Sequence, residues 1–148
     1  MKSLFNQADR AALLARLERL TPDIPPRWGK FNATRMVAHL NDVVRMATGE
    51  LAVVPRPGKM TNVVMRNLFI YFMPFPKSVP TAPELLARGS SAEFSAECAA
   101  FRVLVEKAAA RPVNASWPNH SLFGGMTRNN WGALGHKHIV HHFKQFGI

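Results

Sequence analysis

The stretch GHKHIVHHFKQFGI, residues 135–148, decides the fold because it spaces histidines as a helix would. His138 and His142 are four residues apart, just over one helical turn, so both imidazoles point to the same side. At about 100° per residue they lie near the middle of an arc of about 140° that faces the core. The other members of this arc are Trp131, Leu134, Gly135, Ile139, Gln145 and Phe146. His136 and His141 fall outside it, and we expect them at the flank of the helix or in solvent.

A third inward histidine is expected on an earlier helix. In NATRMVAHLNDVVRMA, residues 32–47, apolar side chains recur at helical spacing together with His39, and Asn32 or Thr34 can cap the start. Three neutral imidazoles from two helices suit a divalent transition metal such as Zn, Ni, Fe or Cu, and three protein ligands keep a position open for water or substrate. We therefore predict a metal site made by the three histidines. The alternative is that they are core histidines hydrogen-bonded to neighbours.

Two stretches resemble the DinB/YfiT-like superfamily of metal-binding four-helix proteins. They are RWGKFNATRMVAHLNDVVR, residues 27–45, and NHSLFGGMTRNNWGALGHKHIVHHFKQFG, residues 119–147. The second ends in H-x2-H-H-x2-Q-F-G, residues 138–147, and is similar to a little-characterised branch of that superfamily. The resemblance implies an all-α fold, a four-helix bundle with a long crossover connection, and metal ligands at His39, His138 and His142.

The resemblance also implies a class of chemistry. Characterised relatives in the wider superfamily are similar to thiol-dependent transferases and isomerases that use a low-molecular-weight thiol, and others resemble metal-dependent hydrolases. We therefore expect a metal-dependent enzyme that uses Zn, Ni or Fe, and in the transferase case a thiol, to act on a small-molecule substrate, with the transferase preferred to the hydrolase. The alternatives are a non-catalytic metal- or ligand-binding module and a basic nucleic-acid-binding protein.

Two residues are candidates for a catalytic role beside the metal. Asp42 follows His39 by three residues and could hydrogen-bond the far nitrogen of a ligand or act as a base, with a simple surface carboxylate as the alternative. The resemblance makes His120 a neighbour of the site, together with Asp42 and Gln145. Ser121 follows His120 where the branch usually has proline, and this departure bears on the path of the loop.

The composition predicts one cytoplasmic domain over residues 1–148. With 47% hydrophobic residues, a chain of this length can bury a single core without disulfides. Cys98 is the single cysteine and has no histidine or second cysteine near it in sequence, so we interpret it as a packed thiol. The first ten residues, MKSLFNQADR, lack the apolar stretch of a signal peptide.

Helix signals divide the chain into five segments. We predict helices over 6–20, over the His39 segment to Thr48-Gly49, and over 61–73, 91–110 and 127–146, with residues 73–83, MPFPKSVPTAP, as an irregular crossing. The apolar run NVVMRNLFIYFMPFP, residues 62–76, is too short to span a bilayer, which takes about 20 residues. We expect it to cover the bundle or the metal pocket, with a homodimer interface and a membrane-surface contact as alternatives.

The formal charge of +10 raises the question of nucleic acid. However, the 19 basic residues are scattered singly, and no DNA- or RNA-binding signature is present. We predict a solvated basic surface and no specific nucleic-acid partner. A further possibility is that Arg35, Arg128 and Lys137 steer an anionic small molecule toward the metal.

Overall fold

Helices make up the regular structure in the part of the chain that the computed structural model describes, residues 1–77, 81–87 and 93–148. The elements are α1 (Gln7–Leu17), α2 (Ala33–Thr48), η1 (a 3-10 helix, Lys59–Thr61), α3 (Val63–Tyr71), α4 (Glu84–Ala87), α5 (Phe94–Ala109) and α6 (Arg128–Gln145). No β-strand occurs in these ranges. The prediction of an all-α fold is therefore confirmed, and the finer prediction of a DinB-like four-helix bundle stays a prediction.

Most helix ends lie within a few residues of the predicted ones. Helix α6 begins and ends one residue inside the predicted range 127–146, and α2 ends at Thr48 as expected. Helix α1 ends at Leu17, three residues early, and α4 was not predicted because four residues carry no periodic signal. Residues 91 and 92 of the predicted fifth helix, and residues 78–80 of the predicted crossing, lie outside the described residues.

Asparagine and threonine side chains set the helix starts. The Asn6 and Asn32 side chains accept hydrogen bonds from the backbone N–H three residues later, at 3.1 and 2.8 Å, and Asn62 does the same for α3. Thr127 and Asn130 form a reciprocal capping box at the start of α6. Because each cap satisfies backbone donors that the first turn leaves unpaired, these residues fix where α2 and α6 begin, and so fix their histidines in register.

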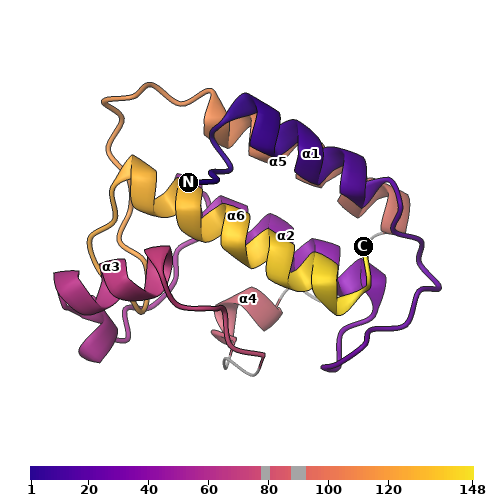
Figure 1. Cartoon of the computed structure of the whole chain (residues 1–148), viewed down its shortest axis with the longest axis horizontal. Helices are drawn as coiled ribbons and strands as arrows, with labels where there is room; N and C mark the ends of the chain where they lie inside the picture. The colour runs from indigo at the N-terminus through magenta and orange to yellow at the C-terminus, as the bar shows by residue number, and fades with distance from the viewer. Residues whose placement is uncertain (78–80, 88–92) are drawn as a thin grey trace.

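The longest helices pack around one apolar core. Helix α2 contacts both α5 and α6, and α1 contacts α5 and α6 (Figure 1). The side chains buried between them are Leu13, Leu17, Met36, Val37, Leu40, Phe101, Val105, Ala108, Ile139 and Phe143. A second buried cluster joins the end of α2, helix α3, the turn at Phe123 and the start of α6. The two helices that carry the histidines are thus held against each other by packing on both sides of the site.

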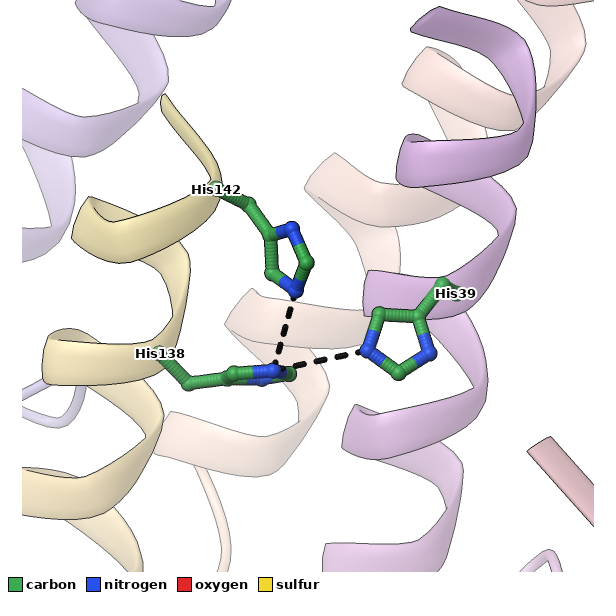
Figure 2. Close-up of side chains that lie close together, drawn as sticks. All are labelled: His39, His138 and His142. Carbon is green, nitrogen blue, oxygen red and sulfur yellow. Dashed lines mark hydrogen bonds between the residues drawn. The ribbon is translucent and has the colours of Figure 1, made fainter. Parts of the chain in front are cut away.

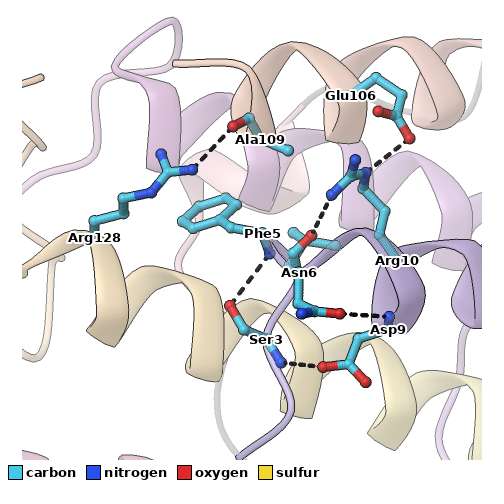
Figure 3. A network of polar contacts seen from close by, with 9 residues as sticks. Ser3, Phe5, Asn6, Asp9, Arg10, Glu106, Ala109 and Arg128 are labelled. Atoms are coloured by element: carbon cyan, nitrogen blue, oxygen red, sulfur yellow. Dashed lines mark hydrogen bonds and ion pairs between the residues drawn. The ribbon is translucent and has the colours of Figure 1, made fainter. Parts of the chain in front are cut away.

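The N-terminal segment crosses α6 at a glycine. Leu4 N–H donates to the Gly132 carbonyl oxygen at 2.9 Å, and a Cβ at Gly132 would lie only 2.3 Å from the Ser3 hydroxyl oxygen. Figure 3 shows the polar contacts that hold this segment, in which the Ser3 backbone binds Asp9 and the Arg10 guanidinium binds Glu106 on α5 at 2.7 Å. The segment is therefore tied to α1 and α6, with Leu4 buried in the core, and α1 is tied to α5 through Arg10.

Helix α3 covers the start of α6, as predicted for residues 62–76. Its Phe69 and Ile70 are buried, and the Lys137 ammonium of α6 donates to the Phe69 and Ile70 carbonyl oxygens. The opposite face of α3 is open, with Val64 73% and Phe72 78% exposed. Among the residues described, none of the helices combines the length and apolar character needed to cross a membrane.

Much of the basic excess is used inside the fold. Arg111 donates to the Thr48 carbonyl oxygen at the end of α2, and Arg128 donates to the Ala109 carbonyl oxygen at the end of α5 (Figure 3). Cations at helix C-termini satisfy unpaired carbonyls and oppose the helix dipole. Other cations that bind backbone carbonyls are Arg16, Arg35, Arg66 and Lys137. These six cations therefore have a structural role within the fold.

We accordingly expect only weak binding to nucleic acid. Binding to duplex or single-stranded DNA should be independent of sequence and largely lost by physiological salt, because diffuse charge without base contacts depends on counterion release. Fluorescence anisotropy over a salt series measures this. A specific complex of nanomolar affinity that survives physiological salt would overturn the interpretation.

Candidate metal centre

Three histidines converge between α2 and α6. His39 projects from α2, and His138 and His142 project from successive turns of α6 (Figure 2). One nitrogen from each ring lies within 4.8 Å of the others. His39 and His142 are 4% and 8% exposed, and His138 is half-buried. The sequence placed these three side chains on the inward faces of their helices, and the structure brings them together as a group that could hold a metal ion.

The distances between the rings match the spacing of ligands around a small ion. His138 Nε2 lies 3.1 Å from His142 Nε2 and 3.4 Å from His39 Nε2 (Figure 2). A tetrahedral zinc ion with Zn–N bonds of about 2.0 to 2.1 Å holds two ligand nitrogens about 3.3 to 3.4 Å apart. Two of the three pairs therefore already have about this spacing, and the third pair, between His39 and His142, lies within 4.8 Å.

Gln145 fixes the tautomer of His142. The Gln145 amide nitrogen donates to the Trp28 carbonyl oxygen at 2.6 Å, which turns the amide oxygen toward His142 Nδ1 at 2.8 Å. Since that oxygen only accepts, His142 Nδ1 carries the proton and His142 Nε2 presents a lone pair. A hydrogen-bonded far nitrogen of this kind is the usual support of a metal-binding histidine.

Hydrogen bonds cannot satisfy both contacts of His138 Nε2, the one with His142 and the one with His39. If His138 Nε2 carries a proton, it can donate it to His142 or to His39, but not to both. If it carries none, its lone pair faces that of His142. The Nδ1 of His39 is buried and has no hydrogen-bond partner among the described residues. That nitrogen stays unpaired with or without an ion, so it does not distinguish the two interpretations. The contacts between the Nε2 atoms do, because hydrogen bonds cannot satisfy both of them, whereas a shared cation would accept all three lone pairs.

Burial keeps the rings neutral. It is the main cause that lowers the pKa of His39 to about 3 and of His142 to about 4. The pKa of His138 is also lowered well below its usual value, first by burial and then by the neighbouring His142 and His39. Neutral imidazoles are the form that binds a metal ion.

The cluster opens into a cavity of about 860 Å³. All three histidines line it, together with mainly apolar side chains from α2, α3, α6 and the loops beside them. The lining also includes Phe31, Val43, Phe69, Phe75, His120, Leu134 and His141. A cavity of this size and character is typical of a small-molecule site.

Asp42 does not join this group. Its carboxylate is 2% exposed and pairs with Arg45 at 3.0 Å, and it does not line the cavity. Because His39 Nδ1 has no partner among the described residues, the possible hydrogen bond from Asp42 to that nitrogen is not formed. The alternative of a surface carboxylate is also wrong, because Asp42 is buried.

The other histidines of α6 lie beside the group, not in it. His141 is half-buried between Trp28 and Phe75, with ring centroids 5.9 and 4.9 Å away, so it is less exposed than a solvent position. His136 is half-buried and does not line the triad's cavity. Both provide natural controls for experiments on the three converging histidines.

The remaining sequence candidates lie away from the triad. Cys98 packs against the core, and burial is the main cause that raises the pKa of its thiol to about 11. Three basic residues donate to backbone carbonyl oxygens and do not line the cavity: Arg35, Arg128 and Lys137. The pKa of His39 is lowered chiefly by burial, and Arg35 is close enough to contribute to this shift. The contacts of these three basic residues give no support to a steering role at the cavity wall.

Trp28 and Gly29 are site residues that sequence reasoning missed. The Trp28 carbonyl holds Gln145, and a Cβ at Gly29 would lie 2.4 Å from the Gln145 amide nitrogen. Gly29 also has a φ of +82°, a backbone angle that residues other than glycine rarely adopt. The only signal in the sequence was a glycine in the connector before α2. Its contact with Gln145, near the end of α6, cannot be read from the neighbouring residues.

Substitutions that disturb Gln145 should weaken metal binding without removing a ligand. Gln145→Leu, which keeps the volume but not the hydrogen bonds, and Gly29→Ala, which displaces the amide, should each lower Zn²⁺ affinity about 10- to 100-fold, as loss of an outer partner does. Competition with a chromophoric chelator measures it. Gly49→Ala is the matched control, because Gly49 also has positive φ but a Cβ there meets no atom within 4 Å. An unchanged affinity in Gln145→Leu would show that Gln145 does not orient His142.

Comparison with known families places the chain. The model of the family described as "Protein of unknown function (DUF1569)" matches residues 2–147. The chain belongs to the DUF1569 family. The match spans both histidine-bearing helices, so the cluster lies within the DUF1569 region. No curated protein and no solved structure matches the chain.

Proposed function

We propose that this DUF1569 protein is a metal-dependent enzyme with a DinB-like four-helix bundle, in which His39, His138 and His142 hold one divalent transition metal ion. The observation that carries the proposal is the opening of the three-histidine cluster into the large cavity. A purely structural metal site is normally closed by four protein ligands, whereas three ligands beside a cavity keep a position for a reacting molecule.

The chemistry proposed is a thiol-dependent transfer to a small molecule, with hydrolysis as the second candidate. A metal ion in this site would lower the pKa of a bound thiol or water molecule enough to supply a nucleophile near neutral pH. The protein contributes neutral ligands, the orientation of His142 by Gln145, and mainly apolar walls. Low-molecular-weight thiols and the reduced Cys98 both fit a cytoplasmic location, which is part of this proposal.

Cobalt substitution tests the thiol directly. Co²⁺-loaded wild-type protein mixed with glutathione or cysteine should develop a sulfur-to-cobalt charge-transfer band, because a metal-bound thiol is deprotonated. His39→Ala should not show the band, since its site has lost a ligand. Cys98→Ser should show it unchanged, because Cys98 lies in packing away from the three histidines.

The outcomes separate the candidate functions. If no thiol perturbs the cobalt spectrum while a simple ester or amide is hydrolysed, the hydrolase replaces the transferase. If neither occurs although the metal is bound, the site is a binding module and the enzymatic proposal is wrong.

A further inference from the structure

The loop between α5 and α6 holds His120 in a tight turn. His120 N–H donates to the Gly124 carbonyl oxygen at 2.8 Å, and Gly124 N–H donates back at 2.9 Å. The guanidinium of Arg66, a buried cation on α3, binds the Phe123 and Gly125 carbonyl oxygens of the same turn. The turn is therefore fixed from inside the protein, and with it the position of the His120 ring.

The backbone of the turn selects one tautomer of His120. Leu122 N–H and Phe123 N–H both point at His120 Nδ1, at 3.1 and 3.4 Å. Because backbone N–H groups only donate, Nδ1 is an acceptor and the proton of the neutral ring is on Nε2. Burial lowers the pKa of His120 to about 4, which keeps the ring neutral. The ring lies beside Phe123 and Trp131, with centroids 4.7 and 5.3 Å away.

The Nε2–H of His120 is a donor without a protein acceptor. The ring lines the same cavity as the three-histidine cluster, and no described residue accepts from His120 Nε2. Two other polar side chains of the wall are already engaged: Arg56 binds both carboxylate oxygens of Glu84, and Gln145 uses both ends of its amide. A fixed N–H that faces an apolar cavity is suited to orient a ligand.

The rest of the wall defines the body of that ligand. Phe31, Val43, Phe69, Phe75 and Leu134 are apolar and line the cavity around the histidines. Polar side chains such as Lys30, Lys77 and Thr81 also line the cavity, but the walls around the histidines are mainly apolar, so a ligand with a largely polar body would lose hydration there. An apolar ligand gains about 25 cal/mol for each Å² of surface removed from water.

We propose that the cavity binds a mainly apolar small molecule that carries a hydrogen-bond acceptor, such as a carbonyl oxygen, and that His120 Nε2–H donates to this acceptor beside the three-histidine cluster. The inference rests on the proposed function only in treating the cavity as the place of reaction. In a transfer this ligand would be the second substrate, and in a hydrolysis it would be the substrate.

The test compares a ketone with a hydrocarbon of the same shape. The probes are 2-acetylnaphthalene and 2-isopropenylnaphthalene, and calorimetry gives their affinities for wild type and His120→Phe. The protein is freed of metal by chelation, so that the ketone cannot contact an ion. We expect both probes to bind wild type, and His120→Phe to lose about 2- to 12-fold in affinity for the ketone alone, the value of one net hydrogen bond. The variant should keep its affinity for the hydrocarbon.

A second readout does not depend on the variant. The carbonyl stretching frequency of bound 2-acetylnaphthalene should be lower in wild type than in an apolar solvent, because the oxygen accepts a hydrogen bond. An unshifted carbonyl band, an equal loss for both probes in His120→Phe, or failure of wild type to bind either probe would overturn the inference. Since these measurements are made without metal, a negative result here leaves the metal site itself untouched, and a failure of metal binding leaves this result valid.

Discussion

Replacing His142 by alanine is expected to lower the affinity for Zn²⁺ by more than about 100-fold, because loss of an outer partner alone costs 10- to 100-fold and this change removes a ligand. The deleted ring presents a Nε2 lone pair to the cluster, fixed by Gln145. Chelator competition with Zn²⁺ and Co²⁺ measures the loss. The same helix supplies two controls, His136→Ala and His141→Ala, which should keep the wild-type affinity.

His141 is the sharper control because it adjoins His142 and lines the same cavity. Its ring centroid is 5.2 Å from that of His142, so His141→Ala changes the local packing without removing a member of the three-histidine cluster. Equal losses in His141→Ala and His142→Ala would mean that the metal is held by a different set of side chains.

Metal should raise the stability of the folded protein by a large amount. The cluster joins α2 to α6 and exists only in the folded chain, so an ion that binds it favours folding. At a free Zn²⁺ concentration about 1,000 times the dissociation constant, the gain is about 4 kcal/mol. For a domain of this length, that corresponds to a rise in Tm of about 8 to 16 °C.

Thermal unfolding followed by circular dichroism, with and without Zn²⁺, measures this shift. His39→Ala should show almost none of it, since the ion then loses its ligand from α2 and no longer joins the two helices. His136→Ala should show the full shift. A wild-type Tm that ignores Zn²⁺, Ni²⁺ and Co²⁺ would contradict a metal site between the helices.

The part of the site that could be predicted from sequence is the part set by helical periodicity. His138 and His142 share a face because of their spacing, and His39 shares a face with Met36 and Leu40, so all three point to the core. Capping residues such as Asn32 and Thr127 are local signals, and they placed the starts of α2 and α6 correctly.

The missed part depends on contacts between distant segments. Gln145 is oriented by the carbonyl of Trp28, which is 117 positions away in the chain, and no periodic pattern records that contact. Asp42 could not be placed either, because its spacing from His39 on α2 did not reveal that it would be buried against Arg45. His141 at the edge of the predicted arc became half-buried through Trp28 and Phe75, which come from loops.

The charge shows the same limit. The total of +10 is a property of the sequence, but the use of Arg111 and Arg128 at the ends of α2 and α5 is a property of the packed helices. Composition alone therefore raised a nucleic-acid function that the contacts of these side chains do not require.

The most direct measurement is the metal content of the protein isolated from cells without an affinity tag and without a nickel column. Elemental analysis of such protein should find about one divalent transition metal ion per chain, bound by His39, His138 and His142. His142→Ala purified in parallel should be nearly metal-free while remaining helical. A well-folded wild-type protein that contains no transition metal, and takes up none from added Zn²⁺, Ni²⁺ or Co²⁺, would contradict the account.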